Sequence, residues 1–86
     1  MGRYSIELVG SIRKDLRRIA KKEVRKILKT IQGLADNPRP ISSKKLTNEE
    51  LYRIRIGNYR ILYEIYDDRL VVLVVKAGHR KDVYKQ

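Results

Sequence analysis

The sequence predicts an α+β fold in one domain spanning residues 1–86. Two observations support this prediction: apolar residues recur at helical spacing between residues 12 and 35, and three segments after residue 50 have the composition of strands. Turn signals separate these three segments, so neighbouring strands should run antiparallel. The expected order is strand, helix, helix, strand, strand, strand, followed by a short C-terminal segment.

The first third of the chain should hold one strand and a helical region. Residues 4–9 alternate weakly between apolar and polar and predict an opening strand. The apolar stripe that begins at residue 12 ends at Asn37-Pro38, because the residue before a proline disfavours the α conformation. A turn near residues 20–23 would divide the region into a helical hairpin that packs on the sheet, and the pattern also leaves one long helix open.

The rest of the chain should be a loop and three strands. Residues 38–48 contain two prolines together with Ser, Thr and Asn, which is typical of a loop. Gly57-Asn58 and Asp67-Asp68 supply the two turns that follow. The three strands are expected at residues 51–56, 59–66 and 69–76.

The turn at Gly57-Asn58 fixes which residues of the first two of these strands face each other. It pairs Ile56 with Tyr59, Arg55 with Arg60, Ile54 with Ile61 and Arg53 with Leu62. One face is then apolar and should pack on the helices, and it holds Tyr52, Ile54, Ile56, Tyr59, Ile61 and Tyr63. The opposite face carries Arg53, Arg55 and Arg60.

Directly opposed arginines, such as Arg55 and Arg60, repel each other by up to about 1 kcal/mol. An anion lying between them would remove this cost, and the guanidinium fork matches phosphate oxygens.

The last predicted strand contains the run LVVLVV, which is apolar on both faces. Such a pattern suits a central or covered strand better than an exposed edge. Something should therefore cover part of the arginine-bearing face, and the candidates are the C-terminal segment, residues 77–86, and a partner protein.

The charge balance favours polyanionic partners. The chain has 21 Lys+Arg against 10 Asp+Glu, a formal net charge of +11. A field of that sign attracts nucleic acid, an anionic membrane surface or an acidic protein. Neither a signal peptide nor a membrane span is expected, because no apolar run is long enough, so the default is a soluble cytoplasmic protein without a membrane partner.

Metal and disulfide chemistry are not expected. The chain has no cysteine and a single histidine, His79, which excludes thiolate zinc sites and multi-histidine metal sites. No cofactor is predicted.

The helical region is strongly basic and is a candidate contact for a nucleic-acid backbone. A merely solvated helix face is the alternative, and the excess of Lys and Arg over Asp15 and Glu23 makes the two interpretations about equal. The RNA-binding candidates, including one lysine from the loop, are Arg17, Arg18, Lys21, Lys22, Arg25 and Lys44.

A phosphodiester of RNA is cleaved when its own 2′-hydroxyl attacks the neighbouring phosphorus. The arginines can stabilise the charge on the phosphorane. They hardly ever deprotonate, so they supply proton transfer poorly. The titratable groups suited to that step are Tyr84 and His79, with Lys44 and Lys45 more distant.

The order of these features resembles the RelE toxins of bacterial and archaeal toxin-antitoxin modules, within the RelE/ParE superfamily. The resemblance covers nearly the whole chain, and its most specific parts are YRIRIGNYRILYEI and GHRKDVY. It implies a RelE-like fold with a twisted antiparallel sheet against an N-terminal helical hairpin. It also implies a ribosome-dependent, metal-independent endoribonuclease that cleaves mRNA and so inhibits translation. The implied partners are the ribosome with its rRNA, mRNA, an acidic RelB-like antitoxin and, together with that antitoxin, operator DNA.

The resemblance also implies a set of site residues. Arg53 and Arg55 match two basic positions of the family's second strand, Arg60 matches the arginine of its third strand, and Arg80 and Tyr84 match a C-terminal arginine and tyrosine. In the family these groups bind the scissile phosphate, stabilise the transition state, and transfer protons or stack on a base. This chain departs from the best-known members, which have lysines where Arg53 and Arg55 stand, and its spacing from Arg80 to Tyr84 is shorter than in some of them.

Two other functions remain open. A ParE-like relative would share the fold and act by binding DNA gyrase, and a degenerate member would bind only its antitoxin and operator DNA. The presence of Arg60, Arg80 and Tyr84 together favours the nuclease.

Overall fold

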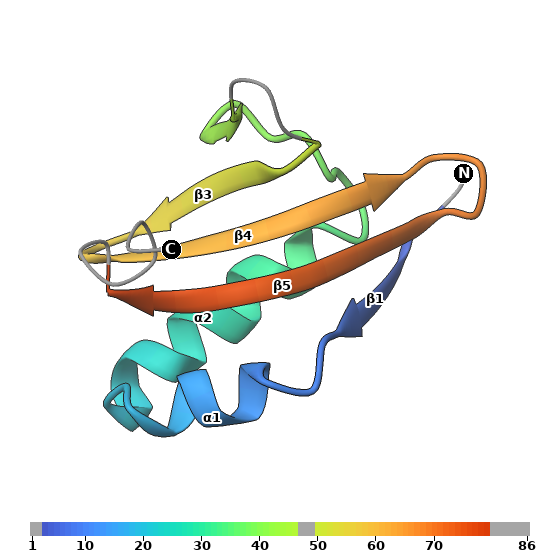
Figure 1. Ribbon diagram of the computed structural model, residues 1–86. Helices are drawn as coiled ribbons and strands as arrows, with labels where there is room; N and C mark the ends of the chain where they lie inside the picture. The colour runs from blue at the N-terminus through green and yellow to red at the C-terminus, as the bar shows by residue number, and fades with distance from the viewer. Residues whose placement is uncertain (1–2, 47–49, 80–86) are drawn as a thin grey trace.

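The computed structural model describes residues 3–46 and 50–79 as a twisted five-stranded sheet with two helices (Figure 1). Along the chain the elements are β1 (Ser5–Leu8), α1 (Ile12–Arg17), α2 (Lys21–Gly33), β2 (Ser43–Lys45), β3 (Tyr52–Ile56), β4 (Tyr59–Tyr66) and β5 (Val71–His79). The predicted α+β fold class is confirmed. In the part of the chain that the structure describes, neither helix is long and apolar enough to cross a membrane.

The sheet is mixed rather than wholly antiparallel, which corrects the predicted topology. Its strand order is β1-β5-β4-β3-β2, and β1 runs parallel to β5 while the other neighbours are antiparallel. Turn signals reveal the direction only of strands that a tight turn joins. β1 and β5 are separated by both helices and three strands, so no local signal reports their pairing. The interior position of β5 explains why LVVLVV is apolar on both faces.

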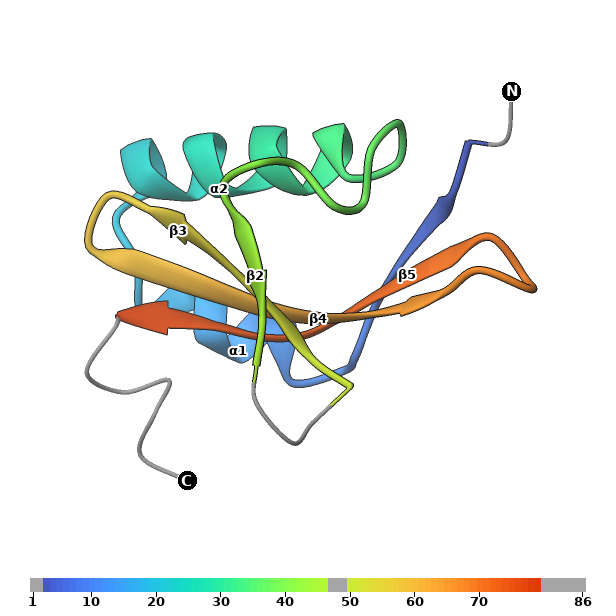
Figure 2. The same cartoon turned by 90° about the horizontal axis from the view of Figure 1, so that it is seen from above.

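The helical region consists of two helices, which resolves the choice that periodicity left open. Arg18 ends α1, and Ala20 has an extended backbone (φ −58°, ψ 140°) immediately before α2. The break spans residues 18–20 and so meets the predicted segment 20–23 at Ala20. α2 lies along one face of the sheet (Figure 2), whereas α1 lies against β5, where the Asp15 carboxylate accepts a hydrogen bond from the Ala77 N–H at 3.2 Å.

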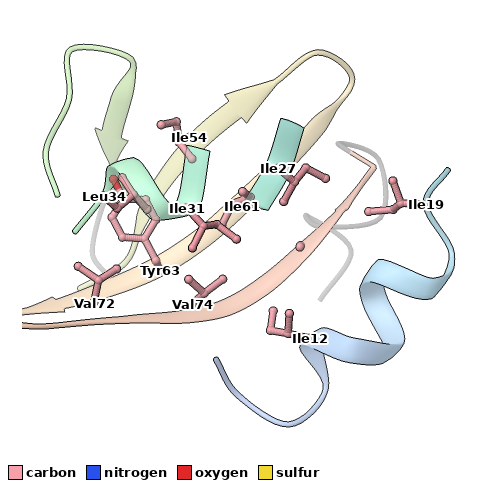
Figure 3. Close-up of a cluster of buried hydrophobic side chains, with 11 residues drawn as sticks. Ile12, Ile19, Ile27, Ile31, Leu34, Ile54, Ile61, Tyr63, Val72 and Val74 are labelled. Carbon is pink, nitrogen blue, oxygen red and sulfur yellow. The ribbon is translucent and has the colours of Figure 1, made fainter. Parts of the chain in front are cut away.

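The core lies between the helices and one face of the sheet (Figure 3). Its buried side chains are Ile12, Ile19, Ile27, Ile31 and Leu34 from the helical half, and Ile54, Ile61, Tyr63, Val72, Val74 and Ala77 from the sheet. The predicted apolar face is confirmed, because its remaining members, Tyr52, Ile56 and Tyr59, pack against this cluster. Tyr63 is fully buried and donates a hydrogen bond to the Pro38 carbonyl at 2.8 Å, so its hydroxyl does not remain unsatisfied.

The turn between β3 and β4 has the predicted length and register. Gly57 has φ +60°, a conformation that glycine adopts without strain and that the first position of a type II′ turn requires. All four predicted cross-strand pairs are observed, including Arg55 opposite Arg60.

Two strand boundaries differ from the prediction. The expected loop 38–48 contains the short strand β2, which pairs with the outer edge of β3. Its sequence Ser-Lys-Lys has no alternation of apolar and polar residues, and lysines are common on edge strands because they discourage further pairing. The last strand begins at Val71 and continues to His79, three residues beyond the predicted end at Lys76.

Candidate nucleic-acid interface

The sheet face turned away from the core carries three arginines from two adjacent strands. Residues alternate between the two faces of a strand, so Arg53, Arg55 and Arg60 lie opposite to the buried Ile54 and Ile61. We call this surface of β3 and β4 the arginine face. Its central pair is Arg55 and Arg60, which face each other directly across the two strands.

The two members of this pair have different surroundings. Arg60 is only 9% exposed, whereas Arg55 is exposed and Arg53 is intermediate. A buried guanidinium has few accessible orientations, while an exposed one can follow a ligand. The pair therefore combines a fixed cation with an adaptable one, which suits two-point contact with a phosphate.

β2 adds a fourth cation to the arginine face. Lys44, expected in a loop, is the direct partner of Arg53 and so lies on the same side of the sheet. Lys45 is the partner of Tyr52, which faces the core side, and its Nζ lies 3.7 Å from the Glu50 carboxylate. Lys45, a more distant candidate, therefore lies on the face of the sheet opposite to the arginines.

His79 does not lie on the arginine face, which corrects its candidate role there. It is the partner of Tyr59 on the helix side of the sheet, and the two rings meet edge-on with centroids 5.8 Å apart. The residue opposite Arg60 is Gly78. The prediction ended the strand at Lys76, so the alternation that turns His79 away could not be seen. Arg80 and Tyr84 lie outside the described residues.

Three tyrosines of the described region, Tyr4, Tyr63 and Tyr66, have pKa values raised above the ordinary value of a phenol. Burial raises the pKa of Tyr63, and a hydrogen bond to the Glu64 carboxylate raises the pKa of Tyr66. A hydrogen bond to Asp67 likewise raises the pKa of Tyr4. None of these three hydroxyls is therefore suited to act as a general base.

The predicted basic residues of the helices form a separate surface. Arg17, Arg18, Lys21, Lys22 and Arg25 are all exposed. Three of them, Arg17, Lys21 and Arg25, line a groove of about 580 Å³ together with the apolar Leu16, Ile19 and Val24. We call this the helix groove. The helix groove is formed by residues of the helical region, whereas the arginine face belongs to β3 and β4. The groove and the arginine face are therefore two separate surfaces.

Sequence reasoning missed Lys76, which is the partner of Leu62 and lies 3.9 Å from the Asp15 carboxylate. Because it directly follows LVVLVV, the sequence indicates only that Lys76 ends a strand.

Among residues 3–46 and 50–79, no three His, Asp or Glu side chains gather in a way that could hold a metal ion.

Residues 6–84 match the family model described as the ParE toxin of the type II toxin-antitoxin system parDE. The chain belongs to the RelE/ParE superfamily of toxins. The toxin is 29% identical over 87 residues to the putative toxin RelE1 of Methanocaldococcus jannaschii, covering 96% of this chain and 97% of that relative. It is 26% identical over 86 residues to toxin RelG of Mycobacterium tuberculosis, covering 96% and 98%.

Solved structures show the same RelE-like fold. The toxin superposes with a TM-score of 0.81 on a chain of the archaeal RelE-RelB complex from Pyrococcus horikoshii, at 27% identity, covering 93% of this chain and 97% of that one. The TM-score is also 0.81 against a chain of the toxin-antitoxin complex RelBE2 from Mycobacterium tuberculosis, at 25% identity and 91% and 99% coverage. The toxin is thus RelE-like in fold as well as in sequence.

Proposed function

We propose that this toxin is a ribosome-dependent endoribonuclease that cleaves mRNA in the cytoplasm without a metal ion and so inhibits translation. The observation that carries the proposal is the direct opposition of Arg55 and Arg60, with Arg53 and Lys44 side by side on the same face. Opposed cations repel, and an intervening phosphate turns this repulsion into attraction.

The arginines act on the charge that develops during cleavage. The 2′-oxygen forms a bond to phosphorus, the bond to the 5′-oxygen of the next nucleotide breaks, and a cyclic phosphate remains. The phosphorane carries more negative charge than the diester, so Arg55 and Arg60 bind it more strongly than the ground state. This difference in binding lowers the barrier.

Cleavage also needs a group that removes the 2′-hydroxyl proton and one that protonates the leaving 5′-oxygen. The family resemblance makes Tyr84 one candidate for proton transfer, with Arg80 as a further phosphate contact. The register supports a second candidate, because Lys44 stands beside Arg53 and, unlike a guanidinium, an amine can exchange its proton.

The proposed partner that restrains the toxin is an acidic, RelB-like antitoxin. The net charge of +11 favours an acidic protein, and the solved relatives from Pyrococcus and Mycobacterium are toxin-antitoxin complexes. The helix groove has an apolar floor and a basic rim, which suits an amphipathic acidic helix. Together the two proteins would also bind operator DNA.

Primer extension on mRNA bound to programmed ribosomes tests the nuclease. Wild-type toxin is expected to produce defined cuts, and Arg55→Ala to reduce their rate by about 100-fold, as for loss of one transition-state contact. Arg55 is exposed, so its replacement leaves the core intact. Arg69→Ala is the matched control. It also removes an exposed arginine, but from the turn between β4 and β5, away from the arginine face. Equal cleavage by Arg55→Ala and wild type would refute the site.

Inhibition of DNA gyrase is the second candidate, and the description of the matching family model favours it. A supercoiling assay with purified gyrase separates the two. Inhibition of supercoiling without ribosome-dependent cuts would replace the nuclease by this function. Absence of both activities, with antitoxin and operator binding retained, would identify a degenerate member.

A further inference from the structure

A second concave site lies at the end of β5, apart from the arginine face. β1 pairs with β5 only from Val71 to Val74, so β5 extends beyond β1 toward α1 (Figure 1). Between α1, the start of β4 and this extension is a cleft of about 290 Å³. We call it the β5 cleft. Its volume is at the lower end of small-molecule sites, about the size for one base or nucleoside.

Two aromatic rings form one wall of the β5 cleft. Tyr59 and His79 both line it, and their planes meet at 79° with centroids 5.8 Å apart. Tyr59 also packs against the core, so this wall is anchored to the fold. Because the two rings are nearly perpendicular, a nucleobase would stack on the face of one of them, and the His79 ring is the candidate.

A carboxylate from α1, that of Asp15, also lines the β5 cleft. The Asp15 side chain is only 14% exposed, with Oδ2 accepting the Ala77 N–H at 3.2 Å and Oδ1 3.9 Å from Lys76 Nζ. A carboxylate has about four lone-pair positions, so these contacts leave Asp15 able to accept another hydrogen bond. Base amino and ring N–H groups are suitable donors.

The cations around the cleft favour a ligand with a phosphate outside it. Arg18 and Lys76 both line the site, and Arg18 is exposed. Lys76 partly offsets the charge of Asp15, so the net attraction for a phosphate is strongest near the exposed Arg18. This arrangement suits a nucleotide whose base enters and whose phosphate stays near the surface.

We propose that the β5 cleft binds the base of one unstacked nucleotide of RNA. Gly78 lines the cleft and is also the direct partner of Arg60, so the cleft and the arginine face flank the same short stretch of β5. An RNA strand that crosses the end of β5 would place one nucleotide in the cleft and a nearby phosphate on the arginine face. The inference rests on the proposed function for its choice of RNA, yet binding can be measured without cleavage.

Nuclear magnetic resonance tests the cleft directly. The ¹⁵N-labelled toxin is titrated separately with the four nucleoside 5′-monophosphates and with inorganic phosphate. At least one nucleotide should shift the amide signals of Ala77 and His79, and inorganic phosphate should not reproduce these shifts. Shifts of equal size with phosphate alone, or none with any nucleotide, would overturn the proposal.

Variants identify the contribution of the ring and of the carboxylate. With a 2′-O-methylated, uncleavable RNA hexamer, His79→Ala should weaken binding by about tenfold, the size expected for one base stack. His79→Phe keeps a ring and should retain most of the affinity, and Arg69→Ala should match wild type. Asp15→Asn can still accept the Ala77 N–H and should alter the order of preference among the four nucleotides. Equal affinity of His79→Ala and wild type, with both folded by circular dichroism, would refute the stacking role.

The source of the nucleotide follows from the ribosome assay. If His79→Ala changes the positions of the cuts, the base belongs to mRNA, whereas an unchanged cut pattern with weaker ribosome binding identifies rRNA. If wild type does not cut mRNA but His79→Ala still loses binding to the hexamer, the proposed nuclease activity is refuted and the proposed base site in the β5 cleft is retained. Normal cuts, normal ribosome binding and normal hexamer binding in His79→Ala would refute the cleft and keep the nuclease.

Discussion

Arg39 binds both carboxylate oxygens of Asp67, with Nη2 2.8 Å from Oδ2 and Nη1 3.2 Å from Oδ1. The same guanidinium donates from Nε to the Tyr52 hydroxyl at 3.1 Å, and the Tyr4 hydroxyl donates to Asp67 at 2.6 Å. The pair thus joins the chain before β1, the segment after α2, β3 and the turn between β4 and β5.

Removal of this pair should destabilise the fold. Arg39→Ala leaves Asp67 without its two-point partner and also removes the cation over the Tyr52 ring. The free energy of unfolding, measured by urea denaturation, should fall, and added salt should narrow the gap to wild type because both groups are partly exposed. Arg3→Ala, which removes a more exposed ion pair with Asp36, is the control and should change less. A smaller loss in Arg39→Ala than in this control would contradict the prediction.

The Arg39–Asp67 pair should also make the stability of the fold depend on pH. Hydrogen bonds from Arg39, and next from Tyr4, hold the pKa of Asp67 below its ordinary value. A carboxyl whose pKa is lowered on folding stabilises the fold fully above its unfolded pKa of about 4, and this contribution disappears as the pH falls through the folded value. Thermal unfolding of wild type and Asp67→Asn between neutral pH and pH 2 should show the two curves converging in acid. A constant difference between them at all pH values would show that Asp67 does not act through its charge.

Arg55 should reduce stability in the absence of an anion. Because Arg55 directly opposes Arg60, Arg55→Ala should raise the free energy of unfolding by up to about 1 kcal/mol in low salt. Phosphate should stabilise wild type more than the variant, since a bound anion joins the two guanidiniums. Equal stabilisation of both proteins by phosphate would exclude an anion site at this pair.

Lys44 can be tested as a group that moves a proton. Lys44→Arg keeps the positive charge beside Arg53 but replaces the amine by a guanidinium that does not deprotonate. If Lys44 transfers a proton, this variant should lose at least about 100-fold in the single-turnover cleavage rate and its pH profile should change. Retained cleavage in Lys44→Arg, with loss in Lys44→Ala, would limit Lys44 to binding phosphate.

Two neighbouring residues of α2 separate packing from surface effects. Ile27 is fully buried, so Ile27→Ala should reduce the free energy of unfolding by about 2–5 kcal/mol. Leu28 is 38% exposed, and Leu28→Ala should cost clearly less. Urea denaturation of both variants measures the difference, and equal losses would contradict the position of α2 on the sheet.

The sequence could predict features that depend on neighbouring residues. Gly57 and the alternation on both sides of it define one turn and one register, so Arg55 opposite Arg60 could be predicted without the structure. The pairing of β1 with β5 joins distant segments and leaves no local pattern. Ser-Lys-Lys lacks alternation and therefore predicts a loop, and only pairing with Arg53 brings Lys44 to the candidate site.

The sequence could not predict the face on which His79 lies, because that face depends on where β5 ends. A strand that stops at Lys76 leaves the next residues without a defined side, and the histidine could then be expected near the arginines. Continued pairing through Gly78 fixes the alternation and turns His79 toward Tyr59. The error in one strand boundary therefore concealed the face on which His79 lies.

The parallel pairing of β1 with β5 has a consequence for synthesis of the chain. Ser5 finds its partner, Val71, only after most of the polypeptide has been made, and pairings between such distant segments form late in folding. Gly78, which stands opposite Arg60, belongs to the same late strand. A nascent chain that ends before β5 therefore lacks one neighbour of β4, and the sheet that supports the arginine face is completed only after β5 has been synthesised.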